Sequence, residues 1–159
     1  MSRQAEMVLL LILVTAAMAF AGHNTEYGRC PYGWVNCGNR CFIYAATPVN
    51  WALAEETCQR YGGHLVSIHN ENEYQTVKTL IRTYDHVEKP TWIGLSGCQQ
   101  KFNWFWSDAT AVTFTKWNHR EPNHFLKECC VHINFGKQKD WNDINCKKQY
   151  PFVCAKGIY

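Results

Sequence analysis

Nine cysteines constrain the fold of this 159-residue chain more than any other feature. All nine follow an apolar, uncharged run over residues 7–20, which is too short to span a bilayer and resembles the hydrophobic part of a signal peptide. Small residues suited to cleavage come next, so we expect residues 1–21 to be a signal peptide and residues 22–29 a short N-terminal extension. A secreted, extracellular chain passes through an oxidising route in which cysteines pair. We therefore expect a disulfide-stapled domain over residues 30–159 that does not insert into a membrane.

The odd number of cysteines leaves one over if four disulfides form within the chain. In a secreted protein such a cysteine often pairs with a second chain. Adjacent Cys129 and Cys130 would be strained if bonded to each other, so each is expected to bond a different partner. Zinc ligation is the competing interpretation, but the sequence has no paired Cys-x-x-Cys knuckles.

Length, charge and histidine placement exclude several functional classes. The length fits one domain. The 16 Lys and Arg residues are scattered and the net charge is only +3, so a nucleic-acid partner is not expected. None of the seven histidines lies in a recognised catalytic motif, and we expect a binding protein and not an enzyme.

The pattern of apolar residues predicts an α+β fold. Asn50 can cap a helix that continues to the Gly62-Gly63 pair, and Asn70 can cap a second helix with Tyr74, Val77 and Ile81 on one face. A small hairpin is expected near the first cysteines, and further strands are expected in these segments: 65–68, 92–95, 104–106, 131–135 and 151–155. Residues 107–127 have little periodicity, and a loop of this length is usually functional or disordered.

Oxygen-bearing side chains gather within and after that loop. They are three carboxylates and two amides: Glu121, Asn123, Glu128, Asn142 and Asp143. Calcium binds six to eight such oxygens, and without a cation gathered carboxylates raise one another's pKa. Taken singly, each of these residues could be an ordinary solvated loop residue.

The chain resembles the C-type lectin-like domain family over residues 30–154. The resemblance is carried by these segments: WALAEETC (51–58), GGHLVSI (62–68), WIGL (92–95), EPN (121–123), ECCV (128–131), WND (141–143) and FVCA (152–155). It is most similar to small secreted lectins of fish mucus, plasma and venom. The resemblance implies a single domain with two helices, antiparallel sheets and a long ligand-binding loop.

The resemblance also implies how the cysteines pair. The expected disulfides are Cys30–Cys41, Cys58–Cys154, Cys130–Cys146 and, as in fish type II antifreeze proteins, Cys98–Cys129. Cys37 then remains, and we expect it to link two chains into a homodimer; a free buried thiol or a small-thiol cap is the alternative.

In this family the five oxygen-bearing residues would hold one Ca²⁺ whose coordination shell is completed by two hydroxyls of a sugar. The same five residues would contact the sugar, together with Phe125, which can stack on it, and neighbouring His124. The Glu121–Pro122 bond is expected to be cis. The acidic residues of an auxiliary calcium site are replaced here by Gly97, Lys101 and His124, so that second ion is not expected.

The resemblance implies a secreted lectin that binds cell-surface or microbial glycans and agglutinates cells in innate defence. EPN resembles the mannose-type motif, whereas Phe125 favours galactose or lactose. A calcium-independent lectin and a protein-binding domain are further alternatives. Ice binding, as in type II antifreeze proteins, is the alternative of another class.

Overall fold

The computed structural model describes residues 28–158, so the expected signal peptide and residues 22–27 lie outside the described part. The elements in chain order are β1 (Val35–Cys37), β2 (Arg40–Val49), α2 (Trp51–Arg60), β3 (His64–Leu65), α3 (Glu71–Tyr84), β4 (Thr91–Gln100), β5 (Asn103–Trp106), a 3₁₀ turn η1 (Phe125–Lys127), β6 (Cys130–Phe135), β7 (Asp140–Ile144) and β8 (Tyr150–Gly157). The α+β composition and the two helices expected from the sequence are confirmed.

Both helices begin at the expected asparagine caps. The Asn50 side chain accepts a hydrogen bond from the Leu53 N–H at 2.9 Å, and the Asn70 side chain accepts one from the Glu73 N–H at 2.9 Å. After α2 the chain passes very close to β8 at Gly63, where a Cβ atom would lie 2.1 Å from a carbonyl oxygen. Only glycine fits there, which explains why the helix is followed by this residue.

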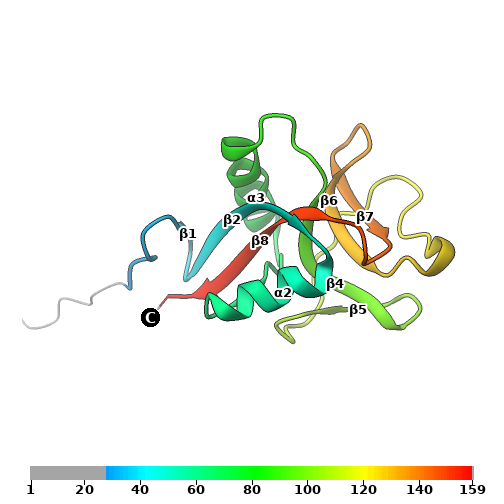
Figure 1. Cartoon of the computed structure of the whole chain (residues 1–159), viewed down its shortest axis with the longest axis horizontal. Helices are drawn as coiled ribbons and strands as arrows, with labels where there is room; N and C mark the ends of the chain where they lie inside the picture. The colour runs from blue at the N-terminus through cyan, green and yellow to red at the C-terminus, as the bar shows by residue number, and fades with distance from the viewer. Residues whose placement is uncertain (1–27, 159) are drawn as a thin grey trace, which may run out of the picture.

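The eight strands found within residues 28–158 join one sheet in the order β1-β2-β8-β4-β6-β7, with β3 paired to β8 and β5 to β4. The C-terminal strand therefore lies in the middle, between β2 and β4 (Figure 1). Its pairing with β4 is parallel, through Trp92 and Phe152, and the other strand pairs are antiparallel. The sheet is thus mixed, whereas the sequence predicted antiparallel sheets. β4 and β8 are not joined by a hairpin, because β5, the long loop, β6 and β7 lie between them in the chain, and a connection of this length allows a parallel pair.

The two helices lie on opposite sides of the β2–β8 pair and bury separate apolar clusters (Figure 1). Helix α3 buries its expected face, Tyr74, Val77 and Ile81, in a cluster that includes Trp141. Helix α2 buries Cys58 in a second cluster. The first cluster also contains Val131 of β6 and Trp141 of β7, so this packing holds the two strands that follow the long loop.

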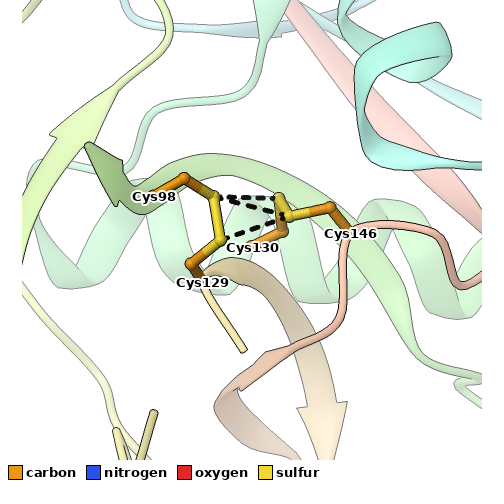
Figure 2. Close-up of side chains that lie close together, drawn as sticks. All are labelled: Cys98, Cys129, Cys130 and Cys146. Carbon is orange, nitrogen blue, oxygen red and sulfur yellow. Dashed lines mark hydrogen bonds between the residues drawn. A yellow bond between two sulfur atoms is a disulfide. The ribbon is translucent and has the colours of Figure 1, made fainter. Parts of the chain in front are cut away.

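Four disulfides are present, and they join the same pairs that the resemblance implies: Cys30–Cys41, Cys58–Cys154, Cys98–Cys129 and Cys130–Cys146. The last two lie against each other, with Cys146 Sγ 3.5 Å from both Cys98 Sγ and Cys129 Sγ (Figure 2). This double disulfide connects the end of β4, the start of β6 and the segment before β8. It therefore fixes the C-terminal end of the long loop.

Cys37 is the one cysteine outside a disulfide among residues 28–158. It is 8% exposed and lies at the end of the edge strand β1. Its Sγ is 3.5 Å from Thr76 Oγ1 and 4.0 Å from Asn72 Nδ2, and Asn72 is itself exposed. The thiol is therefore buried against α3 and belongs to the apolar cluster that α3 helps to form. No helix within the described residues is both long and apolar enough to cross a membrane.

Candidate functional site

The long loop over residues 107–129 is held against β7 by backbone contacts. Trp117 forms a parallel bridge with Trp141, whose backbone N–H donates to the Lys116 carbonyl at 2.9 Å. The Asn118 N–H donates to the Trp141 carbonyl at 2.9 Å. These contacts place the loop beside the strand that bears Asn142 and Asp143, so two of the segments that carry the expected site residues lie together.

The Asp143 carboxylate fixes the backbone of the loop at two residues. Asp143 is fully buried, and its carboxylate accepts hydrogen bonds from the backbone N–H groups of Asn123 at 3.0 Å and His124 at 2.7 Å. The Glu121–Pro122 bond just before them is cis, as the resemblance implies. Asp143 thus holds the backbone at 123 and 124, and the Glu121 side chain on the other side of the proline lies next to its carboxylate.

Glu121 carries an unsatisfied buried atom. Its Oε2 has no hydrogen-bond partner among residues 28–158. Burial, together with the neighbouring Asp143 carboxyl group, raises the pKa of Glu121 to about 7. In the free protein, the missing hydrogen-bond donor and the repulsion from a second carboxylate are both unfavourable. A divalent cation bound between the two carboxylates would remove both effects.

Glu128, near the end of the loop, interacts electrostatically with Glu121 and Asp143. Burial and then the charge of Asp143 raise its pKa above the ordinary value. The three carboxylates are therefore close enough to influence one another. Their donor chemistry, all hard oxygens, fits calcium better than a soft metal.

Asn142 is fixed by a residue that sequence reasoning did not connect with the site. Its Nδ2 lies 3.1 Å from His132 Nε2, while His132 Nδ1 lies 3.0 Å from the Ile133 carbonyl oxygen. That carbonyl can only accept, so His132 carries its proton on Nδ1 and its Nε2 accepts from Asn142. Burial lowers the pKa of His132 to about 4, which keeps the ring neutral. The amide of Asn142 is therefore oriented by a histidine ten residues earlier. The only sequence signal was a histidine inside an apolar segment, and the structure places this histidine in the buried part of β6.

The three residues after the cis proline direct their side chains differently: Asn123, His124 and Phe125. The Asn123 side-chain oxygen accepts a hydrogen bond from the Phe125 N–H at 2.7 Å, which stabilises the turn. Phe125 is 63% exposed and does not pack into the body of the domain. The His124 ring lies against Phe102, whose backbone N–H donates a hydrogen bond to His124 Nε2 at 3.0 Å. Phe125 is thus available for stacking, and His124 faces the turn between β4 and β5.

A second polar cluster contains serine, histidine and aspartate but lacks the arrangement of a nucleophilic site. Ser67 Oγ donates directly to Asp108, while His69 Nε2 lies 3.1 Å from the serine oxygen. Arg40 also donates to Ser67 Oγ at 2.8 Å, and Ser67 is fully buried. A catalytic triad needs the acid to orient the histidine and the serine to face a substrate. This cluster instead ties β2 to the segment after β5.

Comparison with known proteins places these features in a family. Residues 47–156 match the Lectin C-type domain. The lactose-binding lectin l-2 of Anguilla japonica is 41% identical over 155 residues, which cover 92% of each chain. The galactose-specific lectin nattectin of Thalassophryne nattereri is 38% identical over 130 residues, 81% of each chain. The solved structure of herring type II antifreeze protein has a TM-score of 0.77 and 37% identity, and covers 82% of this chain and 100% of that one. Matches to lectins and an antifreeze protein agree with the expectation of a binding domain and not an enzyme.

Proposed function

Since the chain belongs to the Lectin C-type domain family, we propose that it is a secreted lectin that binds glycans through one calcium ion. The residues that would hold the ion are the five oxygen-bearing side chains expected from the sequence: Glu121, Asn123, Glu128, Asn142 and Asp143. The observation that carries the proposal is the orphaned, buried Oε2 of Glu121 beside the Asp143 carboxylate. An auxiliary calcium ion is not part of the proposal.

The protein's own groups would orient the sugar. When bound, calcium would supply coordination positions for two neighbouring hydroxyl oxygens. Glu121 can accept a hydroxyl proton, and this charge-assisted bond is roughly twice as strong as a neutral one. Asn142 uses one N–H for His132 and retains a second that can donate to a hydroxyl oxygen. The exposed ring of Phe125 offers an apolar platform for a sugar face.

Two sugar classes compete within this proposal. The EPN triplet at 121–123 argues for a mannose-type ligand, which is the preference drawn from the sequence. The names of two relatives, a lactose-binding and a galactose-specific lectin, and the exposure of Phe125 argue for the galactose class. Parallel mannose and lactose columns decide between them.

We further propose that two chains join through Cys37, which would give the avidity needed to agglutinate cells or microbes in defence. Cys37 is at the end of the edge strand β1, and its thiol contacts Asn72 and Thr76. Formation of the interchain bond therefore requires a rotation of its side chain out of contact with Thr76.

Ice binding is the second candidate because the herring antifreeze protein shares the fold over its whole length. Such proteins need a flat surface that fits ice. The long loop here bears exposed, charged or bulky side chains, among them His119, Arg120 and Lys127. These side chains argue against ice as the ligand.

Affinity chromatography tests the function directly. The mature chain, applied in calcium to mannose and lactose columns, is expected to be retained on one of them and to elute with EDTA. Retention that survives EDTA would keep the lectin and remove the metal from the account. Absence of retention together with thermal hysteresis would replace the proposal with ice binding.

A further inference from the structure

A pocket of about 510 Å³ adjoins the candidate calcium site. It lies between the end of β4 and the end of the long loop, and its lining includes Cys98, Lys101, His124, Lys127, Glu128 and Cys129. Its volume is within the range of about 300–1,000 Å³ typical of small-molecule sites. Glu128 belongs to both the pocket and the proposed calcium ligands, so the two sites are contiguous.

The walls of this pocket are joined to each other. The Cys98–Cys129 disulfide crosses from β4 to the loop and rests on a second disulfide, Cys130–Cys146 (Figure 2). The Phe102 N–H donates to His124 Nε2 at 3.0 Å, and the two rings pack edge-to-face at 4.6 Å. Two loops that are far apart in the sequence are thus tied together covalently and by a hydrogen bond, so the pocket is preformed.

The charge of the pocket favours an anion. Lys101 and Lys127 contribute two ammonium groups, and Lys101 Nζ is positioned 5.0 Å from the ring centroid of Phe102. His124 accepts through Nε2, so its Nδ1 carries a proton that can be donated. The acidic group in the lining is Glu128, whose charge would be neutralised by calcium. The pocket then presents donors and positive charge next to the sugar.

We propose that this pocket binds an anionic substituent, a sulfate ester or a carboxylate, on a glycan whose neutral sugar occupies the candidate calcium site. The inference rests on the proposed function and adds the ligand class, namely acidic glycans. The lysine side chains supply the selectivity, while the five oxygen-bearing residues supply the affinity for the sugar itself.

The test compares one sugar with and without the anionic group. Calorimetry in calcium would measure lactose, sulfated lactose and sialyllactose, or mannose and sulfated mannose if mannose is the retained sugar. Each exposed charge pair gives up to about fivefold in affinity, so we expect the acidic form to bind about 5- to 20-fold more tightly. That ratio should fall as salt is added.

Matched variants separate the pocket from the overall charge. In Lys101→Gln/Lys127→Gln the ratio of acidic to neutral affinity should fall close to one. In Lys89→Gln/Lys137→Gln, which removes the same charge from exposed residues that do not line the pocket, the ratio should be kept. Neutral sugar bound with no preference for the acidic form would overturn this inference and leave the proposed function standing. A preference kept in the first variant would also overturn it, and binding of neither sugar would overturn both.

Discussion

Glu121→Gln should have opposite effects on stability with and without calcium. In the free protein the pKa of Glu121 is about 7 against an ordinary value of 4.5. Since the folded pKa is the higher one, the wild-type fold keeps its full stability below about pH 4.5 and loses some as the pH rises through about 7. The difference of about 2.5 units corresponds to about 3 kcal/mol at 1.36 kcal/mol per unit. Because Glu121 is partly exposed, solvent screening reduces this to about 1 kcal/mol.

Glutamine cannot ionise, so the variant should not carry that cost. In EDTA at about pH 8 it should be more stable than wild type by about 1 kcal/mol, or about 3–6 °C in Tm, and at about pH 5 the difference should shrink. In millimolar calcium the order should reverse, because wild type gains binding energy that the variant lacks. Urea and thermal unfolding with the disulfides intact would measure both effects. Glu56→Gln is the matched control, since Glu56 is exposed on α2.

Two outcomes would refute the reasoning. The first is a Glu121→Gln variant that is less stable than wild type in EDTA at about pH 8, which would mean that the carboxylate is well solvated or paired in the free protein. The second is an equal gain in stability from calcium in both proteins, which would remove Glu121 from the metal site.

Three other changes test separate parts of the account. Asn142→Asp should abolish sugar retention and also cost about 1–3 kcal/mol in urea unfolding, because a carboxylate would face the unprotonated Nε2 of His132; unaltered retention would contradict the ion-bridged contact. Glu55→Gln should lower stability at neutral pH by about 1–3 kcal/mol. Burial alone would raise the pKa of Glu55, but hydrogen bonds from the Leu65 N–H, Gln59 and His64 bring it below its ordinary value. The stabilisation is therefore present above the pKa of the unfolded chain and is lost as the pH falls through the pKa of the folded protein. An equal loss of stability at acid and neutral pH in urea unfolding would contradict this. Cys37→Ser should run as a monomer on non-reducing gels and agglutinate cells poorly, and a persisting dimer band would exclude Cys37 as the link.

Local sequence patterns predicted most of the fold. The two asparagine caps and the apolar face of α3 placed the helices, because both signals act within a few residues of the chain. The position of β8 between β2 and β4 depends on pairings between residues that are far apart in the sequence, so no local pattern indicates it. The disulfide pairs likewise came from the family resemblance and not from spacing.

The sequence could name the residues of the candidate site but not the contacts that hold them in place. Four of the five oxygen-bearing residues could be named because EPN and WND are short, contiguous motifs, and Glu128 could be named from the adjoining ECCV segment. The partner of Asn142, His132, lies on the neighbouring strand and becomes visible only through the β6–β7 register, which pairs the two residues directly. The basic pocket was not predicted, because Lys101 and Lys127 lie far apart in the sequence and their segments meet through the Cys98–Cys129 disulfide, the Gly97–Cys129 backbone bond and the Phe102–His124 bond.

Linked titration of calcium and sugar tests the central claim most directly. If one ion is shared between the protein and the sugar, calorimetry should find one calcium per chain, and saturating sugar should tighten calcium by the same factor by which saturating calcium tightens sugar. Sugar binding of the same affinity in calcium and in EDTA would contradict the account.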